Sequence, residues 1–250
     1  MAAPVLRPLS VGEVLDVSFG LYRAAFVPLL VVALVCRAIP TIIQIYLNAS
    51  GGFTEHWMLA LANMVASAVL ATLGVAASTF IVSGAYLGQD VTAESALRQA
   101  VAYIWPLFVL ALMTGLVVIV GFLLLIVPGF IALAGLALAT VALVLEHPLR
   151  ATDAMSRSWE LSKGYRGKIL VTMLVSYLLL LIPTMIVGVL AAVLTLFGGS
   201  SQIVTGVIAG VLTVFVYPFL YVVLTVLYYD LRVRKEGFDL ELLATATQPT

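Results

Sequence analysis

Arg37 is the side chain whose position most suggests chemistry, because it lies inside an apolar run, VVALVCRAIP, at residues 31–40. It falls about eleven residues into a predicted membrane span, near mid-bilayer at about 1.5 Å per residue. An arginine at that depth costs roughly 2.5–3.5 kcal/mol. None of the acidic residues lies inside a predicted span, so a buried pair between Arg37 and a carboxylate is not expected.

Several groups can offset the cost of burying Arg37. They are a backbone carbonyl freed at Pro40, polar side chains, a water-filled cavity and an anionic ligand such as a lipid phosphate. The polar candidates are Gln44, Asn63, Ser67 and Ser78. In a structural interpretation, Arg37 extends toward the interface or bonds to backbone. We give this interpretation the same weight as all binding interpretations together.

The two histidines do not suggest a catalytic or metal site. His56 follows Glu55 in a connector that offers no third ligand of the usual kind, and His147 falls on the opposite predicted membrane face. Glu146 beside His147 could relay protons, although a salt bridge from Glu146 to Arg150 or another arginine explains it more simply. The sequence has no Gly-rich phosphate loop, serine elbow or zinc-peptidase helix, so we expect neither an enzyme nor a cofactor or bound metal.

Composition places the chain among integral membrane proteins. Apolar residues make up 63% of it and charged residues 10%, and several uninterrupted apolar runs exceed 18 residues. A net charge of zero argues against a nucleic-acid partner. Cys36 is the only cysteine, which excludes an intrachain disulfide. We expect residues 1–250 to form one membrane domain, with the first span retained and not cleaved as a signal peptide.

The apolar runs predict six membrane-spanning helices, near 26–47, 57–87, 104–127, 129–145, 169–197 and 202–228. Val127, Pro128 and Gly129 are the predicted turn between the third and fourth helices, and residues 197–201 separate the fifth from the sixth. Eleven of the twelve basic residues fall in the termini or the even-numbered connectors, and the twelfth is Arg37. The positive-inside rule therefore predicts that both termini are cytoplasmic.

Three cytoplasmic segments show apolar residues at helical spacing, before the first, third and fifth spans. They lie near residues 10–26, 93–104 and 148–164. We therefore predict an all-α membrane protein of three hairpins, each preceded by an amphipathic helix in the membrane plane. Residue matches among the three copies are weak, so the repeat is a structural hypothesis.

Four segments resemble the glycerophosphoryl diester phosphodiesterase membrane domain family and its bacterial and archaeal relatives of unassigned function. They are LSVGEVLDVSFGLYRAAF (9–26), VPG (127–129), VLEHPLRATDAMSRSWELSKG (144–164) and LYYDLRVRKEGFDLEL (227–242). The most specific matches are cytoplasmic and make a candidate interaction motif, namely Glu146, Arg157, Trp159, Gly164, Asp230 and Arg232. The resemblance implies a six-helix bundle in a bacterial plasma membrane. It implies no chemistry, because the catalytic domain fused to some members has no counterpart here.

Three classes of function remain. The first is a non-catalytic scaffold or accessory subunit that packs membrane lipid or recruits partner membrane proteins, or a second copy, at the cytoplasmic face. The alternative is a transporter or lipid-handling protein with Arg37 in a polar cavity that binds an anionic group, which a polar opening to one leaflet would favour. An enzyme acting on lipids is the least supported, because no acid, base or metal set converges.

Overall fold

The computed structural model describes residues 7–50, 52–146, 148–196 and 202–237, and within those ranges its regular secondary structure is helical. The helices are α1 (Val11–Ala24), α2 (Phe26–Ala49), α3 (Gly52–Glu55), α4 (Trp57–Tyr86), α5 (Ala93–Ala102), α6 (Ile104–Leu124), α7 (Ile126–Leu136), α8 (Ala139–Leu145), α9 (Ala151–Ser162), α10 (Arg166–Leu196) and α11 (Gln202–Glu236).

Six helical segments are long and apolar enough to cross a membrane, which confirms the predicted class of a multi-pass membrane protein. They are Phe26–Ala49, Trp57–Tyr86, Ile104–Leu124, Ile126–Leu145, Arg166–Ile186 and Gly206–Glu236. The fourth comprises α7 and α8. The predicted break at 197–201 lies outside the described residues.

The turn between α6 and α7 lies earlier than predicted. Leu125 is the extended residue (φ −166°, ψ 157°), and α7 already begins at Ile126. Pro128 and Gly129 therefore lie in the first turn of α7, where proline loses no helical hydrogen bond because the first N–H groups have no partner within the helix. A Cβ on Gly129 would lie 2.4 Å from the Phe122 ring. The absence of a side chain at Gly129 thus permits close packing of α7 on α6, and the turn is made without it.

The last helix runs farther than predicted. The apolar pattern suggested an end near residue 228, but α11 continues to Glu236. Two ion pairs one helical turn apart, Asp230 with Arg234 and Arg232 with Glu236, support this charged end. Hydropathy does not detect such an extension, because it is stabilised by charge pairs.

A short helix precedes three of the long ones: α1 before α2, α5 before α6 and α9 before α10. Each has a capped start. The Ser10 and Thr92 hydroxyls accept hydrogen bonds from the N–H groups of Glu13 and Ser95, at 3.3 and 3.2 Å. At α9 the Asp153 carboxylate accepts from the Arg150 N–H at 3.3 Å.

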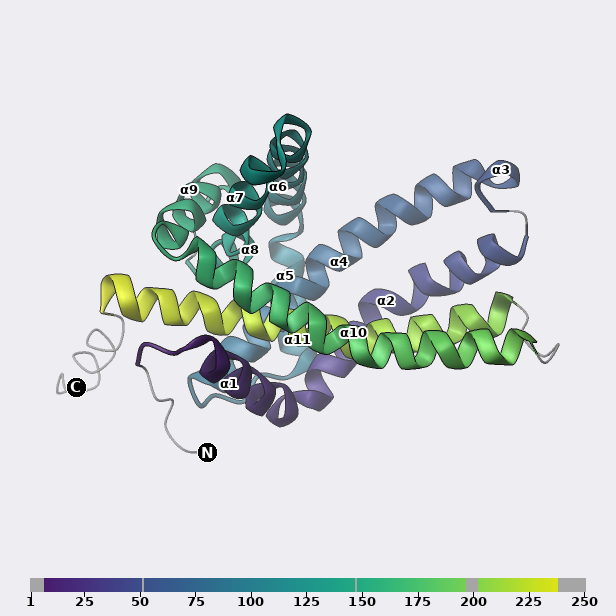
Figure 1. The fold of residues 1–250 in the computed structure, drawn as a ribbon, viewed down its shortest axis with the longest axis horizontal. Helices are drawn as coiled ribbons and strands as arrows, with labels where there is room; N and C mark the ends of the chain where they lie inside the picture. The colour runs from purple at the N-terminus through teal and green to yellow at the C-terminus, as the bar shows by residue number, and fades with distance from the viewer. Residues whose placement is uncertain (1–6, 51, 147, 197–201, 238–250) are drawn as a thin grey trace.

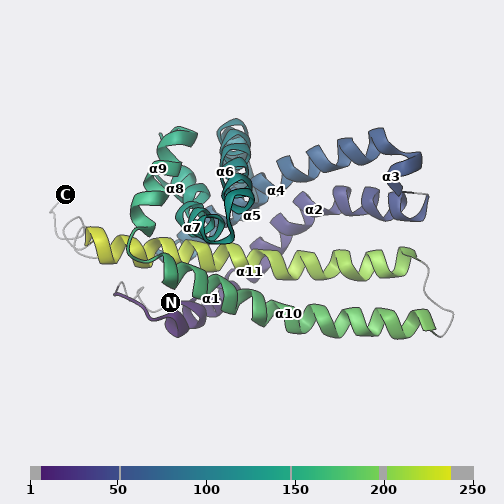
Figure 2. The same ribbon diagram turned by 45° about the horizontal axis from the view of Figure 1, so that its top comes forward.

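The long helices form two groups. Figure 1 shows α2 and α4 extending to the same side of the molecule as α10 and α11, whereas α6 and α7 run in a different direction, and the turned view in Figure 2 shows the same division. The buried core includes Leu29 of α2, Ile81 of α4, Leu143 of α8 and Leu227 of α11. The α6–α7 turn carries exposed apolar side chains from Leu123 to Val127, as expected of a surface that faces acyl chains.

Candidate functional site

Arg37 is the twelfth of the 24 residues of α2 and is half-buried. Its guanidinium carbon lies 4.3 Å from the centroid of the Tyr217 ring on α11, a cation–π contact. Tyr221 and Ser78 line the same small cavity beside it. Among the described residues, no ion pair joins Arg37 to a carboxylate. The charge of Arg37 is therefore faced by an aromatic ring and polar groups.

A polar cavity of about 270 Å³ begins at Arg37 and follows α2. Arg37, Thr41, Gln44 and Asn48 line it at intervals of four, three and four residues, the spacing of one helical face. Asn48 lies in the last turn of α2. The cavity thus runs from the middle of a membrane-spanning helix to its end.

Two further helices complete this cavity. Asn63 and Ser67 line it from α4, and Gly206, Gly210 and Thr213 line it from α11. A Cβ on Gly206 would lie 2.7 Å from Ile45 Cγ1, and one on Gly210 would lie 2.5 Å from Thr41 Cγ2. The two glycines, spaced as GxxxG, therefore allow α11 to approach α2 closely at the cavity.

Asn63 is 4% exposed and holds the amide side chains of this cavity in place. Its Nδ2 donates to the Pro40 carbonyl oxygen at 3.3 Å and to Gln44 Oε1 at 3.4 Å. Gln44 Nε2 in turn donates to Asn48 Oδ1 at 3.0 Å. Of the four polar side chains expected near Arg37 from the sequence, Gln44 and Asn63 thus share one network, Ser67 lines the same cavity and Ser78 lines the neighbouring one.

A larger apolar cavity of about 390 Å³ lies between α10 and α11. Its walls include Leu180 and Leu181 of α10 and Leu212, Thr213 and Tyr217 of α11. Thr213 also lines the polar cavity, and Tyr217 is the ring that faces Arg37. The apolar and the polar cavity therefore share the wall residues Ala209 and Thr213 of α11.

Three residues of the predicted cytoplasmic motif, Glu146, Arg157 and Arg232, join three helices through Glu236, which the motif did not include. Arg157 Nε donates to both carboxylate oxygens of Glu146, at 2.9 and 2.7 Å, and its Nη2 donates to Glu236 at 2.8 Å. Arg232 also donates to Glu236, at 3.0 Å. Hydrogen bonding to Glu236 and then to Glu146 raises the pKa of Arg157 above its ordinary value. The partner of Glu146 is thus Arg157, and the pair ties α9 to the end of α8 and to α11.

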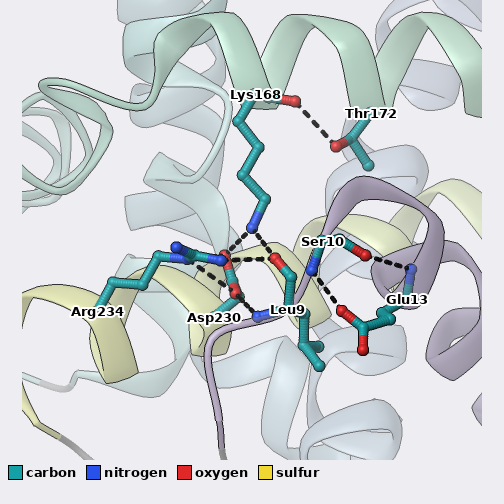
Figure 3. Close-up of polar contacts among 7 residues, drawn as sticks. All are labelled: Leu9, Ser10, Glu13, Lys168, Thr172, Asp230 and Arg234. Atoms are coloured by element: carbon teal, nitrogen blue, oxygen red, sulfur yellow. Dashed lines mark hydrogen bonds and ion pairs between the residues drawn. The ribbon is translucent and has the colours of Figure 1, made fainter.

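Asp230 belongs to a second cluster, which holds the segment before α1 (Figure 3). Its carboxylate is 1% exposed, forms ion pairs with Lys168 and Arg234, and accepts from the Leu9 N–H at 2.7 Å. The Leu9 carbonyl accepts from Lys168 and from Arg234, each at 2.6 Å. Both backbone polar groups of Leu9 are therefore bound by side chains of α10 and α11. We name these four residues the Leu9 clamp.

The remaining motif residues have packing and turn roles. The Trp159 ring stacks on the Arg166 guanidinium, whose central carbon lies 4.0 Å from the ring centroid. The same ring packs against Gly135 of α7. Gly164 has φ +88°, a conformation that a residue with a side chain rarely adopts, and it follows the end of α9. All six motif residues thus make intramolecular contacts or set backbone geometry.

Sequence reasoning missed the Leu9 clamp and the role of Tyr217. Lys168 is one of the eleven basic residues outside the predicted spans, and nothing in the sequence pattern indicates that the Leu9 backbone is its partner. Tyr217 could have been noticed as an aromatic residue on a helix that bears Gly210 and Gly206 about two and three turns earlier. In the described part of the chain, no group of three or more His, Cys, Asp or Glu side chains could hold a metal ion.

Comparison with known proteins adds no relative: no family model matches the chain, and neither the curated proteins nor the solved structures include one similar to it. The proposals below therefore depend on the residues and their geometry.

Proposed function

We propose that this protein is a non-catalytic integral membrane protein that binds an anionic lipid, with the lipid phosphate at Arg37. The observation that carries the proposal is the polar cavity that runs from Arg37 to Asn48 at the end of α2. A guanidinium recognises phosphate oxygens through paired, charge-assisted hydrogen bonds. Binding an anion in this cavity would offset the cost of an arginine at mid-membrane.

The neighbouring apolar cavity supports a lipid as the ligand, in preference to a soluble anion. Thr213 faces both spaces and Tyr217 lines the apolar one while stacking on Arg37. A ligand with an anionic head and an acyl chain can therefore occupy both. The apolar space, about 390 Å³, is within the range of about 300–1,000 Å³ typical of ligand sites.

The proposal includes an orientation in the membrane. The distribution of Lys and Arg supports cytoplasmic termini in a bacterial inner membrane, with three hairpins each following an in-plane helix (α1, α5 or α9). In that orientation the Asn48 end of the cavity faces the outer leaflet. The ligand would then enter sideways from that leaflet.

Recruitment of a partner membrane protein or of a second copy is the second candidate function. It is favoured by exposed apolar side chains on the three short helices, Phe19 on α1 (56% exposed), Val101 on α5 (57%) and Trp159 on α9 (39%). Such side chains suit a lipid interface or a docked helix equally. The two functions are compatible, because the residues that line the Arg37 cavity belong to α2, α4 and α11 and not to these three short helices.

The test compares lipid retention by wild type and Arg37→Leu in native mass spectrometry, after exposure to mixed phosphatidylglycerol and phosphatidylcholine. We expect wild type to retain phosphatidylglycerol selectively and Arg37→Leu to lose at least about tenfold in that selectivity, the usual scale for a hydrogen bond to a charged group. Arg37→Lys keeps the positive charge but lacks the paired N–H donors of the guanidinium, so its lipid selectivity should fall between those of wild type and Arg37→Leu. Inorganic phosphate added as a competitor should not displace the lipid.

Stability measurements distinguish binding from a structural role. Removing an arginine from mid-membrane relieves a cost of roughly 2.5–3.5 kcal/mol, so lipid-free Arg37→Leu should unfold at the same temperature as wild type or higher. A lower unfolding temperature together with unchanged lipid selectivity would contradict the proposal and assign Arg37 to packing against Tyr217. Displacement by phosphate would identify a soluble anion as the ligand.

A further inference from the structure

We infer that the lipid bound at Arg37 carries a hydroxylated headgroup, whose hydroxyl donates a hydrogen bond to Asn63. The inference rests on the proposed function, and it adds the chemical class of the headgroup. It comes from a separate observation, which is a buried acceptor without a partner on a residue that lines the cavity.

Asn63 Oδ1 is that acceptor. It accepts no hydrogen bond from any part of the chain that the structure describes, and it belongs to a residue that lines the cavity beginning at Arg37. Because the oxygen itself is buried, the Asn63 side chain must turn toward the cavity to accept from a ligand. A buried polar atom without a partner costs free energy, and few such atoms occur in native proteins. An acceptor left in this state beside a cavity indicates a ligand group that donates.

The orientation of the Asn63 amide follows from its neighbours. The Pro40 carbonyl can only accept, so the atom 3.3 Å from it must be the donor Nδ2. Gln44 is fixed in the same sense, because its Oε1 accepts from Asn63 while its Nε2 donates to Asn48. Exchanging oxygen and nitrogen on Asn63 would place its amide oxygen against the Pro40 carbonyl oxygen, and both atoms are acceptors. The free atom is therefore the oxygen, and it requires a donor.

The charge of Arg37 limits which donor this is. The cationic Arg37 in the same wall disfavours an ammonium headgroup, because like charges in a space of low dielectric repel strongly. A neutral hydroxyl carries no such penalty and is a good donor to an amide oxygen. Anionic phosphate for Arg37 and hydroxyl for Asn63 together describe a phosphodiester lipid with a polyol head.

The test uses two lipids that differ only in the headgroup alcohol, dioleoylphosphatidylglycerol, whose glycerol head has two free hydroxyls, and dioleoylphosphatidylmethanol, whose methyl head has none. Both are anionic phosphodiesters with the same acyl chains. Their retention by purified wild type is compared in native mass spectrometry at equal concentrations, with dioleoylphosphatidylcholine as the non-anionic reference. We expect wild type to favour phosphatidylglycerol over phosphatidylmethanol by about tenfold, since leaving Asn63 Oδ1 unpaired in the complex has that order of cost.

Asn63→Leu removes the acceptor at similar volume, and we expect it to reduce the preference to near unity while both anionic lipids are still retained over phosphatidylcholine. The matched control is Thr72→Val, also on α4, whose hydroxyl bonds to the Val69 carbonyl of its own helix. It should keep the wild-type preference.

Equal retention of the two anionic lipids by wild type would overturn the inference and leave anionic lipid binding in place. A preference that survives Asn63→Leu would also overturn it. Failure of wild type to favour either anionic lipid over phosphatidylcholine would overturn the proposed function, and the inference with it. If Asn63→Leu does not fold, the wild-type comparison of the two lipids decides alone.

Discussion

Asp230 and Arg37 are both charged residues in apolar helices, yet the groups that surround the two charges differ. Asp230 is 1% exposed and has two basic partners, Lys168 and Arg234, as well as the N–H of Leu9. A buried charge with this many partners is a structural element. Arg37 has an aromatic ring and a polar cavity instead. This contrast supports binding at Arg37 and a fixed fold at Asp230.

The Leu9 clamp gives a prediction for Asp230→Asn. The substitution leaves Lys168 and Arg234, with side chains 14% and 23% exposed, without their shared counterion. Loss of one partner of a buried ion pair typically costs about 3–5 kcal/mol. We expect the unfolding temperature in detergent to fall markedly, and limited proteolysis to cut the segment before α1 faster than in wild type.

Glu94→Gln is the matched control, because Glu94 and Arg98 form an i,i+4 pair with side chains about 80% exposed. Exposed pairs contribute about 0–1 kcal/mol, so this variant should unfold like wild type. Equal unfolding temperatures for Asp230→Asn and Glu94→Gln would show that the clamp does not stabilise the fold.

At the scale of the helices, periodicity and hydropathy predicted well where burial alone decides the structure. The starts of α2, α4 and α6 fall at the predicted residues 26, 57 and 104. Prediction failed where specific contacts decide. The α6–α7 turn is set by Leu125, and the pair Pro128–Gly129 serves packing. The end of α11 depends on charge pairs.

The candidate site was predictable in part for the same reason. Gln44, Asn63 and Ser67 could be named from the sequence as neighbours of Arg37, because few polar residues lie within the spans. Which of them has a buried oxygen without a partner depends on tertiary contacts, such as that between Asn63 and the Pro40 carbonyl. No local pattern contains that information.

The contact between α7 and α9 gives a prediction at this scale. A Cβ on Gly135 would lie 2.4 Å from Trp159 Cε3, and the Ser158 hydroxyl donates to the Gly135 carbonyl at 2.7 Å. Because Arg166 stacks on the Trp159 ring, the ring cannot move without losing that contact. Gly135→Ala should therefore destabilise the protein by about 1–3 kcal/mol, the range for overpacking, and change the emission spectrum of Trp159 in thermal unfolding monitored by fluorescence.

Gly115→Ala serves as the comparison, because nothing lies within 4 Å of its added Cβ. Alanine favours a helix over glycine by up to about 1 kcal/mol, so this variant should be neutral or slightly more stable. If Gly135→Ala is as stable as Gly115→Ala, α9 can shift on α7 at no cost in stability, and the predicted overpacking is absent.

Across the whole molecule, the charged clusters and the cavity lie at different ends of the long helices. The Leu9 clamp and the Arg157 cluster involve the start of α10 and the last turns of α11. The polar cavity involves Gly206 and Gly210, near the start of α11, and Asn48 at the end of α2. The described part of the protein thus has one end fixed by charge pairs and another end that contains the polar cavity. The distribution of basic residues predicts which of the two faces the cytoplasm.

That orientation can be measured with single cysteines, because the native Cys36 is 2% exposed and should not react. Glu55→Cys marks the connector between α2 and α4, and Arg98→Cys marks α5. We expect an impermeant maleimide to label Glu55→Cys in intact bacterial cells, and Arg98→Cys only after the membrane is permeabilised, since a basic cytoplasmic face places the two on opposite sides. The reverse labelling would turn the cavity toward the cytoplasmic leaflet, and the lipid would then have to come from that side. In the six-span topology one crossing, α4, separates the two sites, so they must lie on opposite faces of the membrane. Labelling of both residues in intact cells would therefore contradict this topology.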